Sequence, residues 1–361
     1  MEDVLPLVIT EETPPDGYER LIFAKDDESG LIAYICIHST LCGPAAGGCR
    51  MWRYDSLDAA RTDVLRLAQG MTAKNALAGV GLGGGKSVIV GDAGKDKSAD
   101  LLRAFGRAVD HLGGQYYTAE DVGISPADMK IVSEETAFAV GLEGGDHGSG
   151  DPSPFTAEGV FQCLKVGARN VFGRDDLTGR RVLVQGLGHV GMSLAEKLHG
   201  AGASLIVSDI NQNAVNDARD RFRADTCGVD EVFDAQMDIF APCALGCILT
   251  MDTAQRLSAQ LICGAANNQL AEDAVAEALR ARGIRYLPDY VVNAGGIISV
   301  AGEIHKAGDS YREARLAGIA TRIEEILEIS AKTQRSTTRV ANELVDQVLA
   351  DAAGTNIELT A

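Results

Sequence analysis

A glycine-rich turn constrains the fold of this chain more than any other part of the sequence. Gly186-Leu-Gly188-His-Val-Gly191 follows the apolar segment 182–185 and opens a helical pattern. In such a unit the glycines allow a tight turn, close approach of a pyrophosphate, and close packing of the helix on the strand. The next apolar segment, 204–208, ends in Asp209, 18 residues after Gly191, where a carboxylate binds the hydroxyls of an adenosine ribose. The spacing predicts a dinucleotide-binding βαβ unit.

The residues after Asp209 favour NAD over NADP. Ile210-Asn-Gln-Asn213 holds no Arg or Lys that could bind a 2′-phosphate. The pyrophosphate would lie at the start of the helix, next to His189 and Val190. A turn that serves packing only, with a solvated aspartate after it, is the alternative.

The order of elements predicts two α/β domains. From 156 to 287, short apolar segments alternate with helical patterns, which is typical of a parallel, doubly wound sheet. A length of 361 residues suits two domains, and the Gly- and Pro-rich stretch Gly141–Pro154 predicts their boundary. We therefore expect a mixed α/β domain over 1–145, an NAD-binding domain over 146–332, and a C-terminal helix over about 333–361 that packs back on the first domain.

The first domain has one unusual lysine. Prolines at 6, 14 and 15 predict that the first fifteen residues form an irregular arm. From Ser56 a helical pattern places Val64, Leu67, Ala68 and Met71 on one face, and the same face continues to Lys74. Lys74 either reaches the surface through its long side chain or has an anionic partner.

Composition excludes several classes of partner. With 33 Lys+Arg and 51 Asp+Glu, the net charge of −18 disfavours binding to nucleic acid or an anionic membrane. No apolar run approaches the roughly 20 residues of a membrane span, and the start has no basic or apolar signal segment. We expect a cytoplasmic protein. The eight cysteines include no C-x-x-C pair and the histidines are scattered, so we expect reduced thiols and no metal.

Lys86 follows three glycines, Gly83-Gly-Gly85. A phosphate loop would need glycine at Val80 and a helix after Ser87, where a strand pattern follows. Residues without side chains instead allow a small ligand to approach the backbone. Lys74 and Lys86 in one site would attract a carboxylate, and Asp121 follows a strand pattern at its carboxyl end, where α/β folds bind ligands. Together with the dinucleotide motif, these residues predict hydride transfer on a small substrate that has a carboxylate.

Seven motifs, in uninterrupted order from about residue 20 to 305, resemble the amino-acid dehydrogenases that act on glutamate, leucine, phenylalanine and valine, the leucine/valine and phenylalanine branches most of all. The motifs are Gly43-Pro-Ala-Ala-Gly-Gly48, Gly70-Met-Thr-Ala-Lys-Asn-Ala76, Gly83-Gly-Gly-Lys86, Thr118-Ala-Glu-Asp-Val-Gly123, Ala241-Pro-Cys-Ala-Leu-Gly246, Gly264-Ala-Ala-Asn-Asn-Gln-Leu270 and Pro288-Asp-Tyr-Val-Val-Asn-Ala-Gly-Gly296.

The resemblance implies reversible oxidative deamination of an L-amino acid by NAD⁺ and water to a 2-oxo acid, ammonia and NADH, in a cleft between two domains. It implies that Lys74, with the Gly47-Gly48 backbone, holds the substrate carboxylate, that Lys86 is the general acid/base, and that Asp121 exchanges protons with the amino group. It also implies a homo-oligomer formed through the first domain. Around the nicotinamide and substrate it places Thr156, Ala244, Ala266, Asn267, Asn268 and Asn293.

The substrate's side chain is expected to be apolar. The pocket positions that the resemblance implies are Ala46, Met71, Ile297 and Val300, none of which is charged. Branched-chain substrates are the prediction, whereas the small Ala46 is familiar from phenylalanine-type enzymes and keeps an aromatic substrate open. Two further alternatives are a dehydrogenase of hydroxy acids, which leaves both lysines unexplained, and a catalytically silent NAD-binding regulator.

Overall fold

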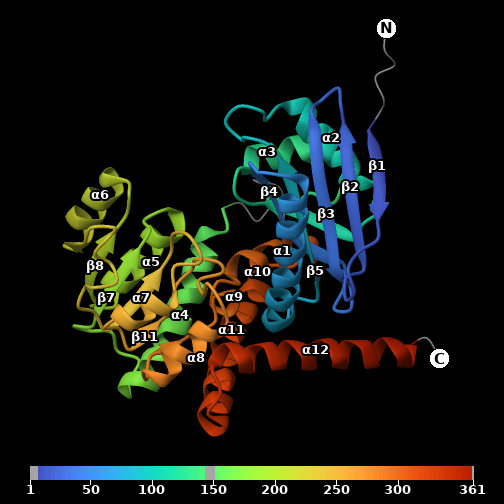
Figure 1. Cartoon of the computed structure of the whole chain (residues 1–361). Coiled ribbons are helices and arrows are strands. Elements are labelled where there is room, and N and C mark those ends of the chain that lie inside the picture. The colour runs from blue at the N-terminus through green and yellow to red at the C-terminus, as the bar shows by residue number, and fades with distance from the viewer. Residues whose placement is uncertain (1–6, 143–150, 360–361) are drawn as a thin grey trace. The chain divides into compact units, whose positions relative to one another are not determined.

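The computed structural model describes residues 7–142 and 151–359, with side chains to residue 354, as two compact units (Figure 1). The first unit comprises Met1–Asp151, Ser299–Arg312 and Gln347–Ala361, and the second comprises Pro152–Ile298 and Glu313–Asp346. Most of the predicted boundary stretch, residues 143–150, lies outside the described residues.

A six-stranded mixed sheet forms the first unit's centre, in the order β1-β2-β3-β5-β4-β6. Strands β1, β2, β3 and β5 pair antiparallel in succession, whereas β4 is parallel to both β5 and β6. The strands are β1 (Val8–Glu12), β2 (Arg20–Asp26), β3 (Leu31–Ser39), β4 (Ala45–Trp52), β5 (Gly83–Val90) and β6 (Tyr116–Glu120). The mixed α/β class predicted for this half is confirmed.

The prediction of an irregular arm over the first fifteen residues is wrong for residues 8–12. They form β1, which pairs antiparallel with β2 along its whole length. The β-branched sequence Val8-Ile-Thr favours a strand. Two ion pairs to other elements, Arg20–Glu11 at 2.7 Å and Arg61–Glu12 at 3.1 Å, hold the strand at the sheet edge. The prolines at 6, 14 and 15, which flank this short strand pattern, led to the prediction of irregular structure.

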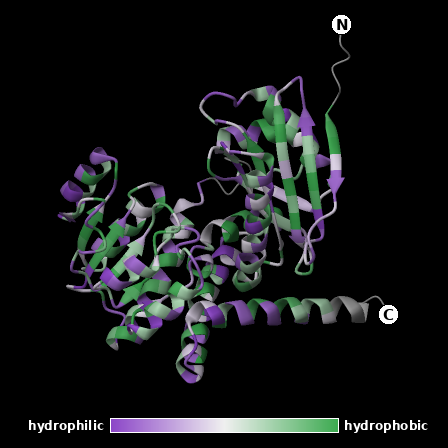
Figure 2. Cartoon of the chain, in the orientation of Figure 1, coloured by the Kyte–Doolittle hydropathy of each residue, from purple (hydrophilic) through white to green (hydrophobic). Residues whose placement is uncertain are grey.

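Helices cover both faces of this sheet. Successive residues of its strands point to opposite faces and therefore pack in two different cores. Along β3, Ala33, Ile35 and Ile37 belong to the core that includes α2 (Ala99–Asp110) and α3 (Pro126–Val132). Tyr34 and Cys36 belong to the core that includes α1 (Leu57–Ala78). Figure 2 shows the long hydrophobic stretches of β2 and β3.

Helix α1 begins and ends where its capping residues predict. The Ser56 side chain accepts a hydrogen bond from the Ala59 amide, and Gly79 ends the helix in the left-handed conformation, with φ of 60°. On the predicted apolar face Val64 and Ala68 are buried, whereas Leu67, Met71 and Lys74 are half-buried. The helix packs on β3 and β5, and this contact places its second half beside the strands.

The second unit contains a parallel sheet in the order β12-β11-β10-β7-β8-β9. Its strands are β7 (Arg181–Gln185), β8 (Ser204–Ser208), β9 (Asp225–Thr226), β10 (Ile239–Pro242), β11 (Leu261–Ile262) and β12 (Arg285–Tyr286). This is the doubly wound Rossmann order, in which the direction of winding reverses between β7 and β10. Ligands of such sheets bind outside the carboxyl ends at that reversal.

Helices precede or follow most of these strands, and only turns connect β9 to β10. The helices are α4 (Ser153–Phe172), α5 (His189–Gly200), α6 (Gln212–Phe222), α7 (Met251–Arg256), α8 (Ala274–Ala281) and α9 (Asp289–Val292), followed by α10 (Gly295–Ile304), α11 (Asp309–Thr333) and α12 (Thr337–Leu359). The predicted two-domain α/β fold with a parallel sheet is thereby confirmed. None of the helices in the described part of the chain is long and apolar enough to cross a membrane.

The segment 299–312 is bonded to the loop before β5. The carbonyl of Val80 accepts a hydrogen bond from the Tyr311 hydroxyl at 3.2 Å and lies 2.7 Å from Nε2 of His305. A carbonyl can only accept, so His305 donates from this nitrogen. These two side chains fix the loop between α1 and β5 within the first unit.

A glycine in β5 determines how closely α1 packs. A Cβ on Gly84 would lie 2.2 Å from the backbone nitrogen of Thr72, whereas a Cβ on Gly70, in the same helix, would meet nothing within 4 Å. We expect Gly84→Ala to lower the free energy of unfolding by about 1–3 kcal/mol, because α1 must move away from β5. Gly70→Ala should raise it by roughly 0.5–1 kcal/mol. Urea unfolding checks both, and a Gly84→Ala midpoint equal to wild type would contradict the packing.

Candidate active site

Lys86, in the middle of β5, and Asp121, at the end of β6, form an ion pair in the first unit. Lys86 lies on β5 and Asp121 directly follows β6, and Nζ of Lys86 is 2.6 Å from Oδ2 of Asp121. The lysine side chain is 7% exposed and the aspartate side chain 19%. The two predicted catalytic residues are therefore in contact.

Asp121 is an anion at neutral pH. Burial would raise the pKa of its carboxyl, but the charges of Lys86 and Arg50 outweigh burial and lower it to about 2. Cys49 lies nearby, and burial raises the pKa of its thiol to about 12. The thiol stays protonated and does not compete with the carboxylate for the lysine.

Glycines 47 and 48 of β4 leave the space in which this pair lies. A Cβ on Gly48 would lie 2.8 Å from Cβ of Asp121 and 3.1 Å from Nζ of Lys86. A Cβ on Gly47 would lie 1.9 Å from the carbonyl oxygen of Gly85 and 3.1 Å from Cγ of Met71. The side-chain-free backbone thus contacts the ammonium group and a predicted pocket residue.

Helix α1 is bonded to both strands beside Lys74. Nδ2 of Asn75 donates to the carbonyls of Ala46 at 3.2 Å and Gly83 at 2.5 Å. Oγ1 of Thr72 lies 2.8 Å from Nδ1 of His38. With Thr72 and Asn75 both anchored, the turn that contains Lys74 has a fixed position against β4 and β5.

Arg50, which sequence analysis did not single out, is a second cation at Asp121. Its Nε lies 3.4 Å from Oδ2 of Asp121, and its Nη1 lies 3.1 Å from Oδ2 of Asp63. Arg50 is two residues after Gly48 on β4 and therefore faces the same side. A charged residue in a strand pattern of otherwise uncharged residues, Ala45–Trp52, was the signal that could have revealed it.

In the second unit, the glycine turn lies at the reversal between β7 and β10. Gly186 has φ of 93°, and a Cβ there would lie 2.7 Å from the amide nitrogen of Ala244, which follows β10. A Cβ on Gly191 would lie 1.9 Å from the carbonyl oxygen of Gly186. Only glycine permits this approach of turn, helix and neighbouring strand. The turn brings Gly186, Gly191 and Ala244 together.

The start of α5 fits a dinucleotide pyrophosphate. Gly188 caps the helix without a side-chain hydrogen bond, and a Cβ there would meet nothing within 4 Å. Amide groups in such a helix start bind phosphate. Oδ2 of Asp209 accepts a hydrogen bond from the Leu187 amide at 2.5 Å, so the carboxylate lies against the turn. His189 and Ile210 are exposed and Val190 is half-buried.

A second group of predicted residues surrounds the loop after β11. Nδ2 of Asn293 donates to Oδ1 of Asn267 at 2.8 Å and to the carbonyl of Ala265 at 3.1 Å. Asn268 has a positive φ of 52°, which reverses the chain here. Ala266 is buried, and its amide donates to the carbonyl of Pro242 at the end of β10.

Thr156 and the α10 residues complete the predicted set. Oγ1 of Thr156 donates to the carbonyl of Pro152 at 3.1 Å. A Cβ on Gly296 would lie 3.2 Å from Oγ1 of Thr156. Ile297 and Val300 are buried on α10, and Ala46 is buried on β4. The site residues divide between the two units: the pair Lys86–Asp121 lies in the first and the dinucleotide turn in the second.

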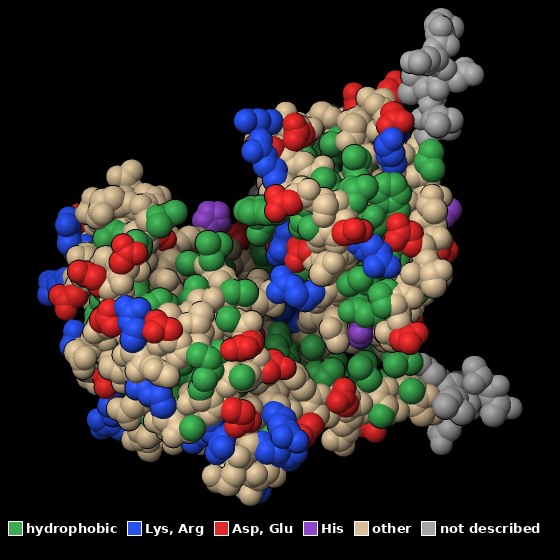
Figure 3. All heavy atoms as spheres, in the orientation of Figure 1, with side chains coloured by type: hydrophobic (Ala, Val, Ile, Leu, Met, Phe, Trp, Pro, Cys, Tyr) green, Lys and Arg blue, Asp and Glu red, His purple; other side chains and the backbone are tan. Residues whose placement is uncertain are grey.

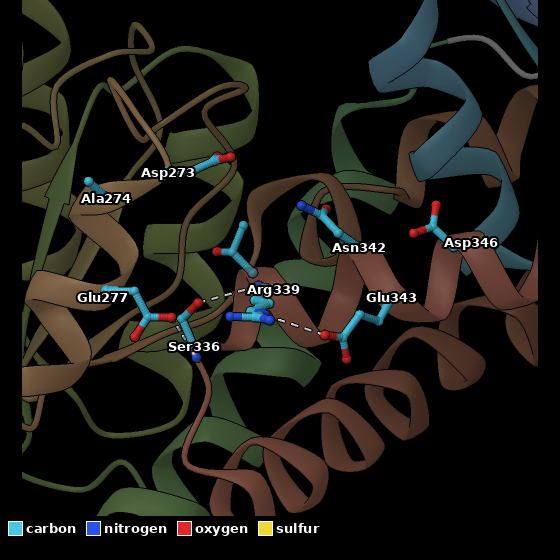
Figure 4. A pocket seen from close by; sticks show the side chains of 9 residues that line it. Asp273, Ala274, Glu277, Ser336, Arg339, Asn342, Glu343 and Asp346 are labelled. Atoms are coloured by element: carbon cyan, nitrogen blue, oxygen red, sulfur yellow. Dashed lines mark hydrogen bonds and ion pairs between the residues drawn. The ribbon is translucent and has the colours of Figure 1, made fainter. Parts of the chain in front are cut away.

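A separate pocket of about 390 Å³ lies in the second unit between α8 and the start of α12 (Figure 4). Arg339 and Glu343, four residues apart on α12, pair at 3.4 Å beside it, and the Ser336 amide donates to Oε1 of Glu277 on α8. None of the predicted site residues lines it. We assign these contacts to the anchoring of α12.

The visible face of the molecule has Lys and Arg side chains interspersed with Asp and Glu (Figure 3). No basic area of the kind that binds nucleic acid gathers on this face.

Two family patterns match the chain. "Glu/Leu/Phe/Val dehydrogenase, dimerisation domain" matches residues 19–138, and "Glutamate/Leucine/Phenylalanine/Valine dehydrogenase" matches residues 210–355. The resemblance drawn from the seven motifs is confirmed, as these matches span most of both units.

Known proteins agree with these matches. A leucine dehydrogenase of Bacillus subtilis (strain 168) is 48% identical over 87% of this chain and 86% of its own. A phenylalanine dehydrogenase of Caldalkalibacillus thermarum (strain TA2.A1) is 41% identical over 94% and 93%. The crystal structure of L-tryptophan dehydrogenase from Nostoc punctiforme superposes with a TM-score of 0.80 at 37% identity, over 93% and 97% of the two chains. The chain belongs to the Glu/Leu/Phe/Val dehydrogenase family.

Proposed function

We propose that this enzyme catalyses the reversible, NAD-dependent oxidative deamination of branched-chain L-amino acids, leucine, valine and isoleucine, to 2-oxo acids and ammonia. The buried Lys86–Asp121 ion pair, next to the bare backbone of Gly47 and Gly48, is the observation that most supports this chemistry. Leucine dehydrogenases that are 45–48% identical over most of the chain support the substrate class.

Each residue of the first unit has a role set by its chemistry. Lys74 and the Gly47-Gly48 backbone hold the substrate carboxylate. Lys86 is the general acid/base: it takes a proton from the attacking water and returns one to the departing nitrogen. Asp121, an anion in contact with Lys86, exchanges protons with the amino group and keeps the lysine oriented. Asn268, in the loop after β11, would contact the substrate.

The cofactor we propose is NAD. The family is NAD(P)-dependent, and the absence of Arg and Lys from residues 210–213 supports NAD. The residues that would hold it are Gly186, Gly188, His189, Val190, Gly191, Asp209, Ile210, Thr156, Ala244, Ala266, Asn267 and Asn293. Bound there, NAD⁺ would supply the acceptor for the substrate's hydride. Asp209 would bind the ribose hydroxyls, and the α5 start the phosphates.

Ala46, Met71, Ile297 and Val300 would form the pocket for the substrate's side chain. None of the four is charged, which supports an apolar substrate over glutamate. The small side chain of Ala46 supports an aromatic substrate as the second candidate. A catalytically silent regulator is not supported, because both lysines and Asp121 are present and the relatives are named dehydrogenases.

The assembly we propose is a homo-oligomer formed through residues 1–145. Support comes from the dimerisation-domain pattern, which matches 19–138. We propose the NAD-binding role for 146–332, of which 299–312 belongs to the first unit. We also propose that the C-terminal helix over about 333–361 packs back on the first domain, to which Gln347–Ala361 belong. The cytoplasm, which supplies NAD and amino acids, is the proposed compartment.

Lys86→Ala should abolish most turnover and leave cofactor binding intact. The variant lacks the general acid/base, so kcat should fall about 10²–10⁴-fold. NADH fluorescence titration should give the wild-type Kd, because the dinucleotide turn lies in the other unit. Lys25→Ala, which removes an exposed lysine paired with Asp27, is the control. Near-normal turnover of Lys86→Ala would overturn the mechanism.

A panel of L-leucine, L-valine, L-phenylalanine, L-tryptophan and L-glutamate with NAD⁺ at alkaline pH tests the substrate. We expect leucine or valine to give kcat/KM about tenfold above phenylalanine, within the discrimination an apolar pocket allows. Glutamate should react least, because the pocket lacks a cation. A best rate on phenylalanine would mean that Ala46 determines the pocket.

Asp209→Asn should weaken the binding of NAD⁺ more than that of NADP⁺. A hydrogen bond to a charged group is worth about 1.5–3 kcal/mol, so we expect KM for NAD⁺ to rise at least ~10-fold and the preference over NADP⁺ to narrow. The control is Asp217→Asn, an exposed aspartate paired with Arg221. Unchanged KM values for both cofactors would remove Asp209 from the site.

A further inference from the structure

Asp121 contacts two cations, and the proposed mechanism uses only one of them. Nζ of Lys86 and Nε of Arg50 lie 2.6 Å and 3.4 Å from the same oxygen, Oδ2. The two nitrogens are therefore within about 6 Å of each other. Both Nε of Arg50 and Oδ2 of Asp121 are shielded from solvent, so water screens this contact little.

Arg50 is itself held from the other side. Its Nη1 pairs with Oδ2 of Asp63 on α1, and that oxygen also accepts a hydrogen bond from the Tyr54 hydroxyl at 2.8 Å. Nη2 of Arg66 pairs with the other oxygen of Asp63 at 3.0 Å. Burial would raise the pKa of Asp63, but Tyr54, Arg66 and Arg50 outweigh it and lower that pKa. The anchor is an anion at neutral pH.

We infer that Arg50 is a positioning residue for the proposed deamination: anchored by Asp63, its guanidinium fixes Asp121 against Lys86 and supplies the second positive charge beside the lysine. This inference rests on the proposed function. A guanidinium suits the role because it is planar and can bond two carboxylates at once, whereas an ammonium is a single point of charge.

The charge of Arg50 affects the proton that the Lys86–Asp121 pair gives up. A positive charge within about 6 Å of Nζ of Lys86 disfavours protonation of the pair. Asp121 acts on three further titratable groups, Cys49 on β4, Tyr116 on β6 and Tyr54, and burial raises the pKa of each above its ordinary value. They are uncharged at neutral pH, and the charges that lower the pKa of Asp121 are those of Lys86 and Arg50.

The test is the pH dependence of kcat/KM in wild type, Arg50→Gln and Arg50→Lys. Arg50→Gln should move the acid-side midpoint upward by about one pH unit and lower kcat at pH 8 at least ~10-fold. Arg50→Lys keeps the charge, so its midpoint should move by less than half as much. Arg53→Gln is the control, because Arg53 pairs with Asp92 at the surface three residues further along.

A structural role alone would lower kcat or the yield of folded enzyme without moving the midpoint. A wild-type midpoint in Arg50→Gln would therefore overturn the inference. Labelling of Lys86 by acetic anhydride against pH, followed by mass spectrometry, gives a second readout that needs no turnover. We expect the same upward shift there. If wild type deaminates no amino acid, the proposed function fails, while the labelling shift still decides the role of Arg50.

Discussion

A backbone without side chains is the constraint on which the first unit depends. Gly47 and Gly48 on β4 and Gly83–Gly85 on β5 bring two strands and α1 to distances that a Cβ would prevent, down to 1.9 Å at Gly47. Between these strands and α1, backbone contacts take the place of side-chain packing. The few side chains that lie against this backbone are therefore fixed in position. Lys86 and Met71 are among them, and Asn75 and Thr72 hold the helix in register.

Electrostatics explains why this arrangement is stable. A buried lysine or aspartate without a partner is costly, and an opposite charge in contact offsets part of that cost. The ion pairs extend from Lys86 through Asp121 and Arg50 to Asp63, with charges that alternate in sign. Each group has an opposite charge on its neighbour, so none is buried alone. Asp121 consequently stays ionised in a partly enclosed site.

Local patterns predicted much of the fold and the proposed site, whereas contacts between distant residues did not follow from them. The turn at Gly186–Gly191 and Asp209 belong to one contiguous βαβ unit, so spacing sufficed. Lys86 and Asp121 were singled out separately, by glycines and by a strand end. Arg50 was not predicted, because its role depends on contacts with Asp63 and Asp121, which are 13 and 71 residues away in the sequence. Strand β1 was not predicted, because two prolines separate it in the sequence from β2, the strand that stabilises it.

The chain passes between the two units four times, after Asp151, Ile298, Arg312 and Asp346. Neither unit is therefore a contiguous stretch of sequence. A gene fragment cut at any single point yields an incomplete unit, with a missing core segment such as the one that holds Val80 through His305 and Tyr311. Exchange of specificity between relatives by recombination would have to transfer several separate segments together. Point substitution in the pocket is the simpler evolutionary route, and the interleaved chain favours it.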